Sequence, residues 1–178
     1  KYFNSTGLFQ NDPKRMKGYT YEGGVRVPFI VSWPDKIKSK RVIDDVSISY
    51  DIFPTLSELS GANDLYTYST DGVSLVDIFT GQDNSLDRDY VYWEFPSYGG
   101  QQAARKGNYK AILKDIKKGN KKIELYNLSI DLYEENDISN QNPEIVKDFE
   151  DIFKKEHIKS DIKRFEMGYI DETKLSQK

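Results

Sequence analysis

The first half of the chain contains one apolar run followed by segments with helical periodicity. Val27 to Trp33 is apolar and rich in β-branched residues, and it closes at Pro34. A continuous run of this kind is typical of a strand buried on both faces, as in a parallel sheet. Such a strand needs neighbours, and no similar run lies nearby in the sequence. We therefore predict that residues 27–33 form the last strand of a larger sheet whose remainder lies outside this segment.

Residues 49–60 are predicted to form a helix. Ser49 is placed to cap its start, and Gly61 occupies the C′ position after its end. The apolar stripe of this helix consists of Ile48, Ile52, Phe53, Leu56 and Leu59. A second, shorter helical segment is predicted over residues 75–79, ending at Gly81.

From about residue 89 the apolar pattern changes to the alternation that is typical of antiparallel strands. Four strands are predicted, over residues 90–95, 101–106, 109–114 and 122–126. Gly107-Asn108 is a two-residue hairpin signal between the second and third strands. Four such strands need an apolar cover on one face of their sheet.

A C-terminal helix is expected to supply this cover. Asn142 stands in the capping position and Pro143 in the first helical position. The apolar stripe comprises Ile145, Phe149, Ile152 and Phe153. The helical pattern continues through Ile158, Ile162 and Phe165, with Ser160 as the point where it could break. We therefore predict a long helix, followed by a frayed tail after Gly168.

Composition limits the chemistry that these residues can support. The 178 residues include 26 basic and 29 acidic side chains, which leaves no basic field for binding nucleic acid. No apolar stretch is long enough for a membrane span. The chain has no cysteine, which excludes disulfides, thiolate metal sites and cysteine nucleophiles. Its single histidine, His157, is expected on the charged side of the late helix.

One candidate for anion binding lies in the polar N-terminal segment. Gly18 permits a close backbone approach beside Lys17, and Glu22 and Arg26 lie within the same loop. A charge cluster of this kind can place an ammonium group in a pocket for an anion. The alternative is a solvated surface lysine, and the residues alone do not decide between the two.

The same loop resembles a segment of the sulfatases of the alkaline phosphatase superfamily. The shared pattern is a lysine, four residues, then Glu-Gly-Gly-x-Arg-x-Pro and an apolar strand that ends in Trp-Pro. The matching positions are Lys17, Glu22, Gly23, Gly24, Arg26, Pro28, Trp33 and Pro34. Four further motifs follow in the family's order, at residues 51–61, 71–81, 92–105 and 124–131. The resemblance covers roughly residues 15 to 140.

The resemblance implies an α+β chain taken from an α/β enzyme of the alkaline phosphatase type. Residues 1–85 would be the terminal part of the catalytic α/β domain and would include the Lys17 loop. Residues 86–170 would be a C-terminal subdomain, a four-stranded antiparallel sheet with its long helix. Residues 171–178 would be the frayed tail. The N-terminal part of the catalytic domain would then be a partner missing from this segment.

The resemblance also implies roles for particular residues. Lys17 would bind the sulfate group and neutralise charge as the ester breaks, and Glu22 and Arg26 would support the loop. A group of polar and aromatic residues could face sugar hydroxyls, with a polar sheet edge as the alternative; these residues are Glu94, Tyr98, Gln101 and Gln102. Pro96 stands where relatives often carry a histidine.

The covalent machinery of such an enzyme is not expected in this segment. The family nucleophile is a formylglycine made from a Cys/Ser-x-Pro/Ala-x-Arg motif, and no serine here has that context. Calcium is the usual family metal and takes oxygen ligands, but we interpret Asp44-Asp45 as a solvated turn. We therefore expect no metal ligand here and no activity from the segment alone.

The function implied for the whole protein is hydrolysis of sulfate esters on a sulfated carbohydrate or aryl sulfate. The family resemblance places such a protein in the periplasm or outside the cell. Two alternatives stay open: a phosphoester or phosphonate hydrolase of the same superfamily, and a non-catalytic module that binds anions or glycans.

Overall fold

The chain forms two compact units in a computed structural model that describes residues 14, 16–37, 41–62, 70–83 and 85–167. One unit combines the residues up to Val27 with those from Tyr92 onward, and the other consists of Pro28–Val91. This division differs from the expected break between residues 85 and 86. The reason is that the Lys17 loop packs on the C-terminal sheet of this chain, where Thr20, Tyr21 and Glu22 are buried.

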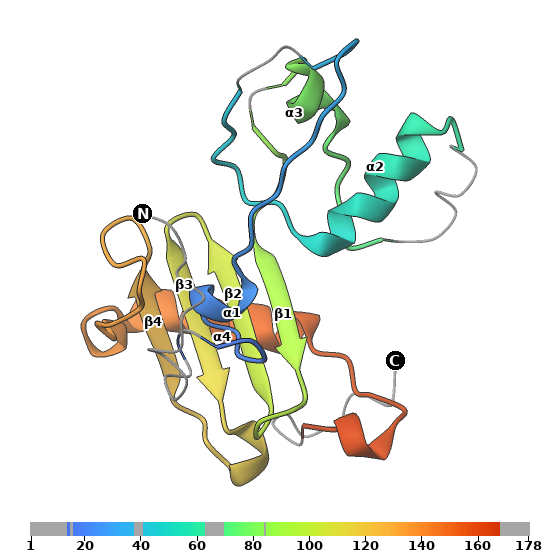
Figure 1. The fold of residues 1–178 in the computed structure, drawn as a ribbon. Coiled ribbons are helices and arrows are strands. Elements are labelled where there is room, and N and C mark those ends of the chain that lie inside the picture. Colours follow the sequence, from blue (N-terminus) through green and yellow to red (C-terminus); the bar gives the residue numbers. More distant parts are fainter. Residues whose placement is uncertain (1–13, 15, 38–40, 63–69, 84, 168–178) are drawn as a thin grey trace. The chain divides into compact units, whose positions relative to one another are not determined.

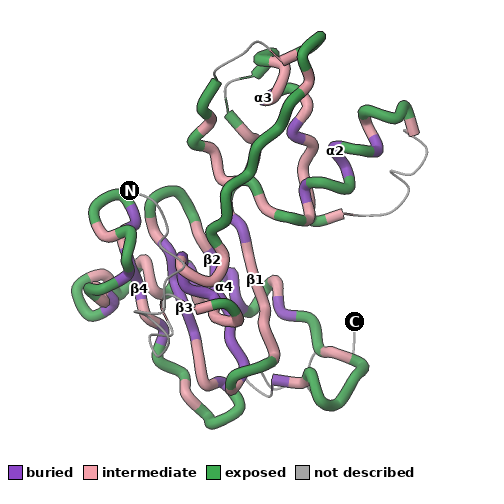
Figure 2. Tube along the Cα trace, in the orientation of Figure 1, coloured by how far each residue is buried: buried purple, intermediate pink, exposed green. Residues whose placement is uncertain are grey.

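The first unit is built on a four-stranded antiparallel sheet, as predicted (Figure 1). The strands lie side by side in the same order as in the sequence. They are β1 Val91–Phe95, β2 Gln101–Lys106, β3 Tyr109–Lys114 and β4 Ile123–Asn127. Ala103 of the inner strand β2 pairs with Ile112 of the inner strand β3, and Ala111 of β3 pairs with Leu125 of the edge strand β4. Gly107 adopts a φ of +57° in the predicted two-residue hairpin turn. The buried positions concentrate along these inner strands (Figure 2).

The two faces of this sheet have different covers. On one face lies the N-terminal segment with the one-turn helix α1, Glu22–Val25, and Tyr21 packs there against Ala103 and Ile112. The other face is crossed by helix α4, Pro143–Glu156. Residues that alternate along each strand therefore point into different surroundings.

Helix α4 supplies the predicted apolar cover and begins at Pro143 as predicted, but its N-terminal capping and its C-terminal end differ from those expected. Phe149, Ile152 and Phe153 are buried. The Asn142 side chain does not cap the helix and instead donates to the carbonyl of Ile138 at 2.9 Å. The helix ends at Glu156, so the helical pattern does not continue unbroken through Phe165 and breaks slightly earlier than the expected point near Ser160.

The residues expected to extend that helix are largely exposed. Ile158 is 81% and Ile162 50% exposed, and Lys163–Phe165 forms only a short 3-10 turn, η6. The helix stops because His157 leaves it in an extended conformation and turns its ring toward the sheet. The predicted frayed tail, 171–178, lies outside the described residues.

The second unit contains the two predicted helical segments. They are the 3-10 turn η2, Ser49–Asp51, continued by α2, Ile52–Leu59, and the short helix α3, Val76–Thr80. Asp51 organises the start of the first segment, because its carboxylate accepts hydrogen bonds from the backbone of Ile48 at 2.9 Å and Val73 at 3.0 Å. The expected cap from Ser49 is absent from the helix start.

The strand predicted over residues 27–33 is not formed. The segment is irregular, with Val27 74% and Ile30 88% exposed. No other described segment pairs with it, and an unpaired extended chain cannot satisfy its backbone hydrogen-bonding groups as a strand does. Across the described parts of the chain, no helix is long and apolar enough to cross a bilayer.

Candidate anion-binding loop

Lys17 lies on an exposed turn that leads into helix α1. Two glycines give this turn its shape. Gly18 has a φ of +93°, a conformation that favours glycine, and a Cβ at Gly24 would lie only 2.1 Å from the carbonyl oxygen of Tyr19. The loop therefore folds back on itself closely, and it does so directly beside the lysine.

Gln101 at the start of β2 ties this loop to the sheet. Its Oε1 accepts a hydrogen bond from the backbone of Thr20 at 3.2 Å, and its Nε2 donates to the carbonyl of Gly18 at 3.1 Å. The side chain is completely buried. Both ends of its amide bind the loop, so Gln101 supports the loop in this chain, and its expected contact with a sugar stays a prediction.

Tyr98, a second residue expected to bind a sugar, also lies beside the loop. It has a φ of +50° and is 60% exposed. Its ring stacks on Tyr19 with the centroids 5.1 Å apart, and it covers Gly18 so closely that a Cβ there would meet it at 2.7 Å. An exposed aromatic ring is suited to packing against a sugar, so this contact stays a prediction.

Glu94 and Gln102 lie on the opposite face of the sheet, under helix α4. Gln102 Nε2 donates to Glu94 Oε1 at 3.0 Å, and Tyr92, whose ring packs against Phe153 of α4, also donates to Glu94. This side-chain cluster faces away from Lys17. In this chain the two side chains bind each other beneath α4, and their expected substrate-binding role stays a prediction.

His157 completes this cluster, contrary to the expectation that it would lie on a charged surface. It is buried, and its Nδ1 lies 2.6 Å from Glu94 Oε1. Burial acts to raise the pKa of Glu94, but the hydrogen bonds from His157, Tyr92 and Gln102 outweigh it and hold the pKa below its ordinary value. The cluster fastens the C-terminal end of α4 to β1.

Glu22, at the start of α1, is buried in a second charged cluster on the Lys17 face of the sheet. Its Oε2 lies 3.6 Å from the guanidinium of Arg26. Its Oε1 lies 2.8 Å from Nζ of Lys110, which in turn lies 3.0 Å from Oε1 of Glu134. The role of Glu22 and Arg26 as loop support stays a prediction, and this geometry agrees with it.

Sequence reasoning missed Lys110 and Glu134. Lys110 occupies a position of β3 that faces the loop side of the sheet, as the two-residue alternation around Ile112 could have indicated. A lysine at a position that periodicity assigns to the core is the signal that could have identified Lys110. Glu134 lies in an irregular segment after β4, where no periodicity marks it.

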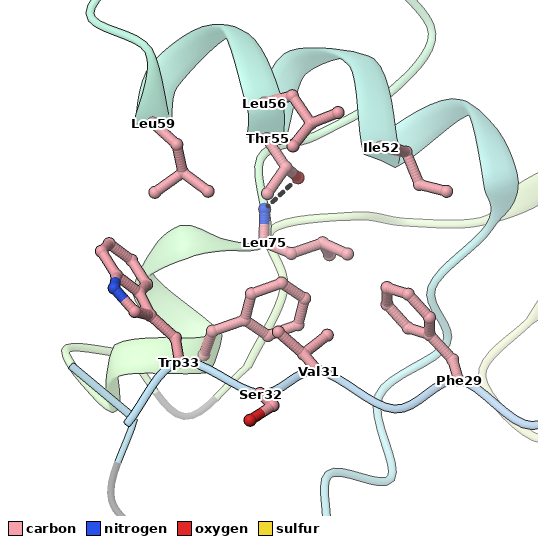
Figure 3. A pocket seen from close by; sticks show the side chains of 10 residues that line it. Phe29, Val31, Ser32, Trp33, Ile52, Thr55, Leu56, Leu59 and Leu75 are labelled. Carbon is pink, nitrogen blue, oxygen red and sulfur yellow. Dashed lines mark hydrogen bonds between the residues drawn. The ribbon is translucent and has the colours of Figure 1, made fainter. Parts of the chain in front are cut away.

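The second unit contains an apolar hollow of about 300 Å³ between α2 and the segment that begins at Phe29 (Figure 3). Its lining is aliphatic and aromatic apart from Ser32 and Thr55, and the Thr55 hydroxyl already accepts a hydrogen bond from the backbone of Leu75 at 3.0 Å. An anion placed there would lose its hydration without gaining a charged partner. The hollow is therefore not a sulfate site.

The described residues offer no site for the calcium ion that the resemblance implies, and no Cys or Ser in the sequence stands in the formylglycine motif. Within the described ranges, no group of three or more His, Cys, Asp or Glu side chains could hold a metal. Asp44 is exposed, and Asp45 Oδ1 accepts a hydrogen bond from the backbone of Leu86 at 3.4 Å. Lys17, an exposed ammonium group on a braced loop, therefore stays the predicted anion-binding residue among those that the structure describes.

The sheet, its helix and this lysine loop define the class of the chain, the C-terminal region of a sulfatase. The family model described as "N-sulphoglucosamine sulphohydrolase, C-terminal" matches residues 10–164, and the chain belongs to this family. An uncharacterized sulfatase of Schizosaccharomyces pombe is 33% identical over 145 residues, which are 76% of this chain and 26% of the relative. Human arylsulfatase A is 38% identical over 99 residues, which are 53% of this chain and 19% of the relative.

Solved structures share the fold. A Bacteroides thetaiotaomicron structure, described in connection with the metabolism of multiple glycosaminoglycans, superposes with a TM-score of 0.58 at 26% identity. That match covers 76% of this chain and 30% of the other. The crystal structure of Ps i-CgsB gives a TM-score of 0.62 at 24% identity, covering 76% of this chain and 29% of that one. This chain thus spans between a fifth and a third of the length of the proteins that it matches.

Proposed function

We propose that the full-length protein hydrolyses sulfate esters and that this chain contributes Lys17 to the site that holds the sulfate group. The observation that carries the proposal is the exposed lysine on a turn that Gln101 and Glu22 fix to the sheet. Membership in a sulfatase family supports the reaction class.

In this proposal Lys17 acts through its charge. An ammonium group that is already in place where negative charge develops stabilises the transition state without further reorganisation. Removal of one such group typically lowers the rate by about 10²–10³-fold. The bracing of the loop matters because this stabilisation depends on the position of the amine.

A sulfated carbohydrate is the proposed substrate. One solved structure that is 26% identical to this chain is described in connection with the metabolism of multiple glycosaminoglycans, and this likeness supports a carbohydrate substrate. The exposed ring of Tyr98, beside the lysine loop, adds a surface against which a sugar can pack. The relatives named arylsulfatase A and steryl-sulfatase make aryl and steroid sulfates the comparison substrates in a test.

We further propose that the formylglycine and the calcium ion of the full-length enzyme are supplied by residues outside this chain. This proposal follows the family resemblance. Among the described residues no cluster could hold a metal, and no Cys or Ser in the sequence stands in the formylglycine motif. For the same reason the segment alone is expected to be inactive. The periplasm or the exterior of the cell is the proposed location of the full-length protein.

The test compares three forms of the full-length protein on sulfated monosaccharides, an aryl sulfate, a steroid sulfate and an aryl phosphate. Lys17→Ala should lower kcat/KM for the preferred sulfate ester by about 10²–10³-fold with unchanged folding. Lys121→Ala, which removes an exposed lysine before β4, should leave it unchanged. Near-normal turnover by Lys17→Ala would remove Lys17 from the mechanism. Faster turnover of the phosphate ester than of every sulfate would favour the phosphoester hydrolase instead.

A further inference from the structure

A fully buried lysine lies beneath the Lys17 loop. Lys110 on β3 has no exposed surface, and its Nζ lies 2.8 Å from Glu22 Oε1 and 3.0 Å from Glu134 Oε1. Lysine is almost never fully buried without a charged partner, because an unpaired ammonium group loses its hydration. Two carboxylates surround this one ammonium group: Glu22 begins helix α1, and Glu134 lies in the irregular segment after β4. We call Glu22, Lys110 and Glu134 the buried triad.

Glu134 contributes more than its charge. Its Oε2 accepts a hydrogen bond from the backbone N–H of Glu22 at 2.6 Å, so it holds the main chain of the loop as well as Lys110. Its own backbone has a φ of +57°, which is uncommon for a residue with a side chain. Such a conformation persists only where the surroundings enforce it. The Asp131 carboxylate holds the backbone that follows Glu134, since it accepts hydrogen bonds from the backbone of Glu135 at 3.0 Å and Asn136 at 2.8 Å.

The surroundings of the triad offset its charge. Arg26 lies 3.6 Å from Glu22, and Arg105 is close enough for Glu22 to act on its pKa. The indole ring of Trp93 lies 5.8 Å from Nζ of Lys110. Burial raises the pKa of Glu134, against the opposing effect of Lys110.

The triad joins three separate parts of the chain at the point where the loop meets the sheet. Helix α1 has only four residues, which is too short to be stable by itself. Glu22 begins this helix five positions after Lys17, and the turn between them folds back closely at Gly18 and Gly24. A shift of Glu22 would therefore move the backbone that carries the lysine.

We propose that Lys110 and Glu134 are positioning residues for Lys17, which act through Glu22 and do not touch the substrate. The inference rests on the proposed function, since it assigns a catalytic consequence to the place of Lys17. The competing explanation is that the triad only stabilises the fold. The two differ in one measurable respect, because a positioning effect on catalysis disappears once Lys17 itself has been removed.

A double-mutant cycle in the full-length protein separates these explanations. Lys110→Met keeps a linear apolar side chain but removes the charge, and it is combined with Lys17→Ala. A displacement of about 1 Å can lower a rate by about 10²-fold, so Lys110→Met alone should lower kcat/KM at least about tenfold. Added to Lys17→Ala, it should lower kcat/KM by less than about twofold. The loss of stability in urea should be the same in both backgrounds.

The remaining outcomes each decide a question. An equal fold loss in kcat/KM with and without Lys17 would overturn the positioning role and leave the proposed function intact. Near-normal activity of Lys17→Ala would overturn both. If Lys110→Met does not fold, the cycle is run with Glu134→Gln, which retains the side-chain volume and an oxygen for the Glu22 amide. A several-fold loss of kcat/KM that requires Lys17 supports the positioning role, and no loss, or a loss independent of Lys17, refutes it.

Discussion

Gln101 offers the sharpest test of how the lysine loop is held. Gln101→Leu removes the side-chain oxygen that accepts from the Thr20 amide at 3.2 Å and the nitrogen that donates to the Gly18 carbonyl at 3.1 Å. The change keeps a similar volume at a position with no exposed surface. The loop would remain connected to the sheet through the buried residues Tyr21 and Glu22, and the ring of Tyr98 would still stack on Tyr19.

The magnitude follows from burial. A buried polar group that loses its partner costs about 1–3 kcal/mol. Thr20 is 2% exposed and cannot easily bind water instead, whereas Gly18 is half-buried and can rehydrate. The Thr20 amide therefore dominates, and local opening of the loop should become easier by about 1–3 kcal/mol. Since about 1.4 kcal/mol corresponds to a tenfold change in an equilibrium constant, the expected effect on opening is roughly 5–150-fold.

Native-state hydrogen exchange of the Thr20 amide measures this opening directly. The experiment compares Gln101→Leu in the full-length protein with Gln102→Leu, which removes the same amide group from the neighbouring position on the opposite face of the sheet. Exchange at Thr20 should accelerate in the first variant only. An unchanged rate in Gln101→Leu, or equal acceleration in both variants, would show that Gln101 does not hold the loop.

Two further predictions concern the sheet and its helix. Phe153→Ala should destabilise the protein by about 3–5 kcal/mol in urea unfolding, because the ring has no exposed surface. Phe165→Ala, at a 37% exposed position, should change stability by less than about 0.5 kcal/mol. Similar losses of stability in the two variants would contradict the described packing. Burial acts to raise the pKa of Asp137, but hydrogen bonds from Ser139, Leu125 and Lys122 outweigh it and lower the pKa from 3.8 to about 2. Its contribution to stability is therefore complete above the unfolded-state pKa and disappears as the pH falls to about 2, so the difference in unfolding free energy between wild type and Asp137→Asn should shrink over that interval. A difference that does not change with pH would contradict this assignment.

The sequence predicted the C-terminal sheet well because antiparallel strands joined by short turns depend on local information. The alternation over residues 101–114 and the Gly107-Asn108 turn determine which residues pair, and the structure has the same register. The same local rules identified the start of α4 at Pro143. They failed at its end, because His157 leaves the helix for a contact with Glu94, a residue 63 positions earlier.

The candidate site shows the same limit. A motif indicated Lys17, Glu22 and Arg26, since a loop with closely spaced glycines and charges is visible in the sequence alone. Adjacent residues of a strand point to opposite faces of the sheet, so Gln101 and Gln102 must lie on different faces. Periodicity alone did not reveal which of the two faces the lysine loop. The face that each residue takes becomes known only when the covers of the sheet are known.

The amino-acid sequence by itself thus determined the sheet, the cover helix, the family pattern and the lysine loop, all of which follow from neighbouring residues. Only the tertiary structure decided that Lys110 and Glu134 lie beneath that loop and that His157 is buried against Glu94. Residues 27–33 show the complementary case, in which an apolar run typical of a buried strand stays irregular among the described residues. The physical reason is common to these cases: burial and strand pairing are properties of segments brought together in space, and a partner far along the chain leaves no local periodicity.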